Sequence, residues 1–153
     1  EKESVEDVVQ SLIFLNSAKI YRIDMELPTV EKFTLTHKLW EKKLYMPSKL
    51  WSVVKILELN GSMKLTTPIY ISPPRYTVPS LAMSSNCALC DRDFYRLFEE
   101  YNKSGNGELF RHLKTEKKCN CLEEWENIYN ASKTDVLFPD RVEKIMDLME
   151  ISL

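Results

Sequence analysis

The chain has 153 residues, of which 44% are hydrophobic, so it is long and apolar enough to bury a core of its own. Its 21 Lys and Arg nearly balance its 23 Asp and Glu, which argues against a polybasic nucleic-acid arm and against an acidic tail. No apolar run approaches the roughly 18 residues that a membrane-spanning helix needs, so a protein that spans a membrane is excluded. The chain begins at Glu1 without an initiator Met, and we expect it to be part of a longer protein.

The N-terminal segment predicts a helix followed by a β-hairpin. From Ser4, a residue suited to cap a helix, apolar residues recur at helical spacing as far as Ile13. Apolar and polar residues then alternate over 21–27 and again over 32–36, on the two sides of Pro28. This period of two is typical of half-buried strands, so a hairpin is expected.

A second helix is expected after Pro47. Its residues are apolar on nearly every side, which indicates a position at the centre of the core, and Asn60-Gly61 is expected to end it. A strand should follow over 63–71, and Pro68 would place that strand at the edge of a sheet.

A Pro-rich stretch before residue 80 divides the chain. We expect an α+β half over 1–79 and a zinc-stabilised, mainly helical half over 80–153, together forming one compact domain of the α+β class. The helices expected in the second half lie near 91–101, 108–118, 121–132 and 140–151.

Two short Cys pairs bracket two predicted helices of similar length. Cys87 and Cys90 precede the first helix, and Cys119 and Cys121 follow the second. Each helix rises about 16 Å at 1.5 Å per residue, so antiparallel packing of the two returns the chain to the first pair. Two such pairs brought together are what tetrahedral zinc needs from protein ligands. The sequence therefore predicts a metal site at the base of a helical hairpin.

The segment 87–121 resembles a divergent zinc finger of the two-Cys, two-His type. It has the paired-Cys knuckle, an aromatic residue at Phe94 and a later helix that carries His112. The resemblance implies one structural zinc ion and a His that faces the knuckle. The match is incomplete, because the gap from Cys90 to His112 is longer than usual and Glu116 stands where the second His would come.

The set of metal ligands stays open between Cys-Cys-His-Cys and four Cys. In either set the protein fills all four positions, so the ion would stabilise the fold and do no chemistry. The candidate metal ligands are Cys87, Cys90, His112, Cys119 and Cys121.

Two other states of the cysteines compete with zinc. Four partly buried free thiols are one alternative for an intracellular protein. The same hairpin geometry also permits a disulfide between the two pairs, which would place the protein outside the cell. Three glycosylation sequons, at Asn60, Asn102 and Asn130, favour that extracellular alternative.

The stretch Asn102–Leu109 resembles the first part of an EF-hand calcium loop. Its ligand positions hold neutral Asn and Ser side chains, whereas calcium affinity depends on carboxylates. We therefore expect a polar turn with Gly at left-handed positions.

Basic residues concentrate in two stretches, 38–49 and 111–118. In the first, lysines interleave with Trp40, Tyr45 and Trp51, a pattern that suits single-stranded nucleic acid. In the second, they surround the candidate His ligand, where a finger helix can contact phosphates. A solvated charged face is the preferred interpretation. The residues of the nucleic-acid alternative are Lys38, Lys42, Lys43, Arg111, Lys114, Lys117 and Lys118.

Catalytic signatures are missing from the sequence. His37 and His112 lie far apart, without a nucleophile motif nearby, and there is no glycine-rich phosphate loop. We therefore expect neither an enzyme nor a small-molecule substrate. The leading interpretation is a non-enzymatic, zinc-stabilised module of a larger intracellular protein, with the nucleus as the favoured location, that binds another protein. The alternatives are a nucleic-acid-binding domain that uses the zinc-finger-like segment and a disulfide-bonded, glycosylated extracellular module.

Overall fold

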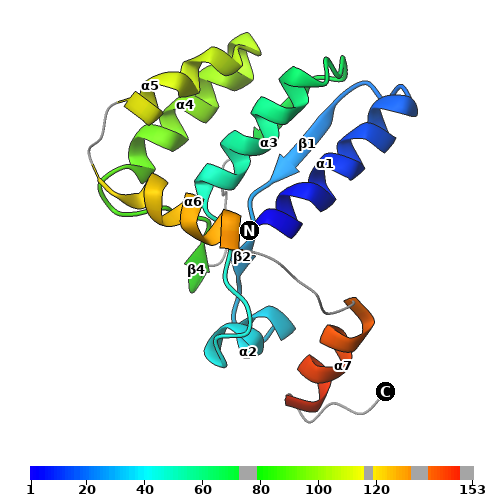
Figure 1. Ribbon diagram of the computed structural model, residues 1–153, viewed down its shortest axis with the longest axis vertical. Helices are drawn as coiled ribbons and strands as arrows, with labels where there is room; N and C mark the ends of the chain where they lie inside the picture. Colours follow the sequence, from blue (N-terminus) through cyan, green and yellow to red (C-terminus); the bar gives the residue numbers. More distant parts are fainter. Residues whose placement is uncertain (73–78, 116–118, 132–137, 149–153) are drawn as a thin grey trace.

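The computed structural model describes residues 1–72, 79–115, 119–131 and 138–148 (Figure 1). These residues form seven α-helices, one 3-10 helix and four short strands, so the predicted α+β class with a mainly helical C-terminal half is confirmed. Within these ranges, no helix has both the length and the apolar character needed to cross a membrane. The elements in chain order are α1 (Lys2–Ser17), β1 (Ile23–Glu26), β2 (Thr29–Val30), α2 (Leu35–Glu41), α3 (Leu50–Ser62), β3 (Ile69–Ser72), β4 (Ala82–Met83), α4 (Asp91–Ser104), η1 (Gly107–Phe110), α5 (Arg111–Thr115), α6 (Cys121–Ala131) and α7 (Phe138–Leu148).

Helix α3 is the centre of the hydrophobic core, as its apolar sequence predicts. In Figure 1, α1 runs along one side of α3, while α4 and α5 lie on its other side. The same hydrophobic cluster includes side chains of α1, α4 and α6, so buried residues from both sides of residue 80 pack together. The division into halves at that residue stays a prediction. The buried residues of α3 are Leu50, Trp51, Ser52, Val53, Val54, Ile56 and Leu57.

The predicted β-hairpin is wrong. Strand β1 pairs in parallel with β3, with Ile23 opposite Ile69, and β2 pairs antiparallel with β4. The residues expected to continue the second hairpin strand begin helix α2 instead, because the Thr34 side chain accepts a hydrogen bond from the His37 N–H at 3.1 Å. Such an N-cap stabilises a helix. The preference for a strand that a short alternating pattern provides is weak in comparison. A parallel pair also needs a long crossover, which α2 and α3 provide.

The other predicted elements are present with shifted boundaries. Helix α1 begins before Ser4, and α3 continues to Ser62, past its expected end. Strand β3 covers only the last part of the range 63–71 and extends one residue beyond it. The helix expected over 108–118 is divided into η1 and α5, and residues 116–118 lie outside the described part. The expected end of the last helix, after Leu148, also lies outside it.

The Asn102 side chain ties the end of α4 to the edge of β3. Its amide accepts a hydrogen bond from the Ile71 N–H and donates one to the Ile71 carbonyl, both at 2.8 Å. The amide thus pairs with the backbone as a neighbouring strand would. The chain turns next at Gly105, whose φ of 66° is left-handed. The expected polar turn is therefore confirmed at Gly105, whereas Gly107 has no positive φ.

Asn102→Ala should remove both hydrogen bonds to Ile71. Each such bond contributes about 1 kcal/mol, so the free energy of unfolding should fall by about 2 kcal/mol. Urea denaturation followed by circular dichroism measures this difference. Lys103→Ala, an exposed neighbour on the same helix, is the control and should cost less than about 0.5 kcal/mol. Equal losses in the two variants would contradict the role assigned to Asn102.

Candidate metal centre

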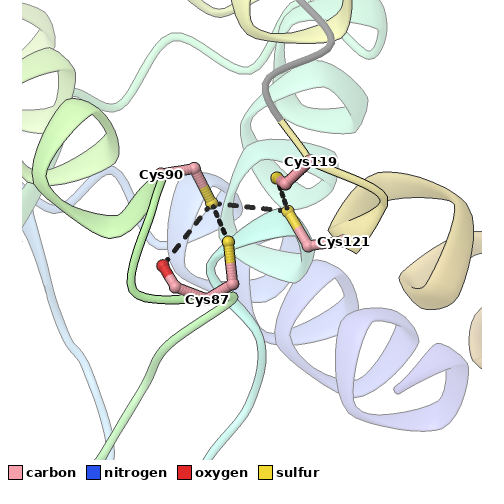
Figure 2. A group of neighbouring side chains, drawn as sticks. All are labelled: Cys87, Cys90, Cys119 and Cys121. Atoms are coloured by element: carbon pink, nitrogen blue, oxygen red, sulfur yellow. Dashed lines mark hydrogen bonds between the residues drawn. The ribbon is translucent and has the colours of Figure 1, made fainter.

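Cys87 and Cys90 lie on a tight turn that leads into α4. The Cys87 carbonyl accepts hydrogen bonds from the N–H groups of Cys90 at 3.2 Å and Asp91 at 3.1 Å. Cys90 is the N-cap residue of α4 and is buried, while Cys87 is half-buried. The turn brings the two sulfur atoms to within 3.2 Å of each other (Figure 2).

Cys119 and Cys121 come from the start of α6. Cys121 is the first residue of the helix, and its sulfur lies 3.0 Å from that of Cys119 and 3.3 Å from that of Cys90. All four sulfur atoms lie within 4.8 Å of one another, two from each side of the group in Figure 2. The two Cys pairs therefore meet, as their spacing predicts.

The spacing of the sulfur atoms fits one metal ion. Thiolate ligands lie about 2.3 Å from zinc, so two ligands of one tetrahedral ion are about 3.8 Å apart. The sulfur atoms here, separated by 3.0 Å at the shortest and by no more than 4.8 Å, bracket that value. In a four-iron cluster, each thiolate would bind a different iron, which spreads the sulfur atoms further. Four thiolates are also a soft donor set, which selects ions such as zinc. The residues therefore fit a single soft metal ion.

Burial and hydrogen bonding shift the pKa values of Cys87, Cys90 and Cys121 in different directions. Burial raises the pKa of Cys90 far above the usual value and raises the pKa of Cys121 to about 11. Burial acts in the same direction at Cys87, but hydrogen bonds with the side chains of Cys90 and Cys119 outweigh it, and the pKa of Cys87 is lowered. Because metal ions bind thiolates, an incoming ion has to displace the protons of the two buried sulfur atoms.

The Asp91 carboxylate holds the turn that carries the first Cys pair. One of its oxygens accepts the N–H groups of Asn86 at 2.7 Å and Cys87 at 3.1 Å, and the other accepts the Ser85 hydroxyl at 2.5 Å. Asp91 also stands in the first turn of α4, where a negative charge is favourable. The Asn86 side chain in turn accepts the Trp51 backbone N–H at 3.1 Å, so the Cys turn is hydrogen-bonded to α3.

A cavity of about 340 Å³ lies beside three of the four sulfur atoms. Its volume is within the range of small-molecule sites, about 300–1,000 Å³. The expectation that the chain takes no small molecule is therefore not supported. The lining includes Cys90, Cys119 and Cys121, the aromatic rings of Trp51 and Phe94, and the charged side chains of Asp93, Lys114, Glu123 and Glu126.

His112 lies outside the sulfur group. Within the described residues, the potential ligand atoms that cluster here belong to the four Cys. His112 is on α5 with an exposed side chain, and it borders a different pocket together with Asp93 and Arg96. The ligand role that the zinc-finger resemblance implies for His112 is thus not part of this geometry.

The four cysteines are free thiols in this structure. Their shortest sulfur–sulfur distance, 3.0 Å between Cys119 and Cys121, exceeds the roughly 2.05 Å of a disulfide bond. A disulfide between the pairs does not describe this arrangement.

The basic residues of the nucleic-acid alternative do not form a stacking surface with Trp51, because that ring is only 3% exposed. Lys38 and Lys43 are exposed, and Lys117 and Lys118 lie outside the described residues. The other three have protein partners: Lys42 donates to the Leu148 carbonyl at 2.7 Å, Arg111 lies 2.6 Å from the Glu108 carboxylate, and Lys114 lies 2.5 Å from that of Glu58.

Sequence reasoning missed two residues that support the sulfur group. Asp91 directly follows Cys90, and an Asp beside a Cys turn is a recognisable signal for side-chain to backbone hydrogen bonding. Trp51 donates its indole N–H to the Cys121 sulfur at 3.3 Å across 70 positions of sequence. No local pattern connects those two positions.

Two archaeal proteins are similar to this chain. It is 28% identical over 130 residues to archaeosine synthase subunit beta of Methanosarcina acetivorans, and 29% identical over 138 residues to archaeosine synthase subunit beta of Thermococcus kodakarensis. These matches cover 84% and 88% of this chain but 35% and 40% of the two relatives, so the chain spans less than half their length. No protein-family model and no solved structure matches the chain.

These relatives overturn the functional interpretation drawn from the sequence. Both are named as subunits of a synthase, which contradicts the expectation of a non-enzymatic protein-interaction module and the expectation that the chain is not an enzyme. Neither the nucleic-acid alternative nor the extracellular alternative is favoured. A nuclear location is not supported, because both relatives are archaeal. The reasoning failed because a chain that matches part of a synthase subunit need not carry that enzyme's catalytic motif.

Asp91→Asn should weaken the turn that holds Cys87 and Cys90. Hydrogen bonds to a charged group contribute about 1.5–3 kcal/mol, so the metal-free protein should lose about 2 kcal/mol of unfolding free energy. Chemical denaturation in the presence of a chelator measures this loss. Glu99→Gln removes the same charge from an exposed position on α4 and should cost less than about 0.5 kcal/mol. If Asp91→Asn cost no more than this control, the role of the carboxylate would be refuted.

Proposed function

We propose that this chain is part of an archaeosine synthase subunit of the beta type and that its four cysteines hold one zinc ion. The meeting of four sulfur atoms from two distant Cys pairs is the observation that carries the metal assignment. The similarity to two archaeal relatives, over more than four-fifths of this chain, supports the synthase assignment. The relatives are named as beta subunits, so we infer a protein partner within the same synthase.

The ligand set assigned to zinc is the four Cys, without His112. Four thiolates fill a tetrahedral coordination shell and leave no position for water, so the bound ion would supply folding free energy. It would join the turn before α4 to the start of α6, two segments whose Cys90 and Cys121 are 31 positions apart. Thiolate ligands persist in a reducing compartment, so we place the protein in the cytoplasm.

Elemental analysis of the purified protein tests the metal centre. The wild type should contain one zinc ion per chain. Cys90→Ser and Cys121→Ser should lose most of it, because each removes a buried sulfur from the group. His112→Ala is the matched control and should keep its zinc, with circular dichroism confirming that each variant is folded. Zinc retained in both Cys variants, or lost in His112→Ala, would contradict the four-Cys assignment.

A segment exchange tests the synthase assignment. This chain would replace the matched segment of the Thermococcus kodakarensis subunit beta, and archaeosine formation would be measured with the remainder of that synthase. We expect activity well above that of a subunit lacking the segment, with loss in Cys90→Ser and retention in His112→Ala. An exchange protein that folds, contains zinc and forms no archaeosine would overturn the assignment.

A further inference from the structure

Two tryptophan side chains form hydrogen bonds in opposite directions across the contact between α3 and α6. The Trp51 indole N–H, on α3, donates to the Cys121 sulfur at 3.3 Å. The Trp125 indole N–H, on α6, donates to the Ser52 hydroxyl at 2.9 Å. Trp51 is 3% exposed and Trp125 is 7% exposed, so both hydrogen bonds are shielded from water. The molecule therefore contains two comparable indole donors, and one of them is directed at a sulfur of the group.

The orientation of Trp51 is fixed by its surroundings. Its ring packs edge-on against Phe94, with the ring centroids 4.7 Å apart and an interplanar angle of 88°. Its backbone N–H donates to the Asn86 side chain, which belongs to the segment entering the first Cys turn. Phe94 is completely buried on α4. Trp51 is thus held through both its backbone and its ring, and its indole N–H points at Cys121.

An indole N–H is a donor only, so it interacts best with a sulfur that carries negative charge. Such a bond stabilises the thiolate that a metal ion requires and fixes the direction of the sulfur lone pairs.

We propose that Trp51 is a positioning residue of the metal centre: its indole N–H holds the Cys121 thiolate in place for the ion and makes α3 a supporting element of the site. This inference rests on the proposed four-Cys centre and extends it to a residue that does not touch the metal. Retention of the metal then depends on the contact of α3 with α6. Trp125 forms a similar hydrogen bond in the same contact, but its acceptor is the Ser52 hydroxyl. Comparing variants at the two tryptophans therefore distinguishes an effect on the metal centre from an effect on the fold.

Cobalt(II) added to the metal-free protein is the probe, because sulfur-to-cobalt charge-transfer bands report on the electron density of the thiolates. Trp51 would be replaced by 3-benzothienylalanine, which keeps the shape of the indole and replaces its N–H with sulfur. The same replacement at Trp125 is the matched control. Thermal unfolding of each metal-free protein checks that the fold is kept.

Bands that appear in the wild type, shift in the Trp51 analogue and stay in place in the Trp125 analogue would support the proposal. Bands that stay in place in both analogues, or shift equally in both, would overturn it and leave the four-Cys centre intact. If the wild type gave no thiolate-to-cobalt bands, the centre itself would be refuted, and the role of Trp51 with it.

Zinc release to a chelator gives a second measurement. Loss of a residue that supports a metal ligand lowers metal affinity by about 10–100-fold, so Trp51→Phe should release zinc at least about 10-fold faster than the wild type. Trp125→Phe should release it at a rate within about 3-fold of the wild type, since its hydrogen bond ends on Ser52. Equal release rates for the two Phe variants would count against the proposal.

Discussion

The sulfur group is the contact on which the placement of α6 depends. The buried residues of this helix are Cys121 and Trp125, one turn apart on one face. Cys121 joins the sulfur group and accepts the Trp51 hydrogen bond, while Trp125 donates to Ser52. The opposite face of the helix carries exposed acidic side chains, so it adds no buried apolar contact. A helix held by so few buried residues needs a strong link at its first turn, and a metal bound by four thiolates would supply one.

Helix α3 can hold α6 in place because α3 is itself held by hydrogen bonds to the start of α1. The Ser52 hydroxyl, which accepts from Trp125, donates to the Glu1 carboxylate, and Glu1 also accepts the Lys49 backbone N–H at 3.3 Å. The start of α1, the start of α3 and the middle of α6 are therefore joined by polar contacts beneath the apolar core. Polar groups that are shielded from water are costly unless they are paired, so these hydrogen bonds favour the observed packing of the three elements. The sulfur group itself lies where α3, α6 and the start of α4 meet.

The sequence allowed the metal-binding residues to be predicted better than the strands. Cys87, Cys90, Cys119 and Cys121 were found because their short spacings and the two intervening helices define a geometry by chain length alone. The prediction of a β-hairpin failed because β1 pairs with β3 across a crossover of two helices. Alternation of apolar and polar residues does not say which strand a given strand will pair with. Trp51 was recognised as apolar and therefore as core, and its indole N–H was overlooked. A hydrogen bond between positions 51 and 121 follows only from tertiary packing.

The proposed four-thiolate centre also bears on the chemistry of this region. Sulfur would fill every coordination position of the ion, so the ion itself would neither polarise a substrate nor activate water. The neighbouring cavity has the size of a small-molecule site, with Trp51 and Phe94 in its lining. The relatives extend well beyond the matched segment. Under the proposed function, this part of the subunit therefore shapes and supports a surface beside the metal.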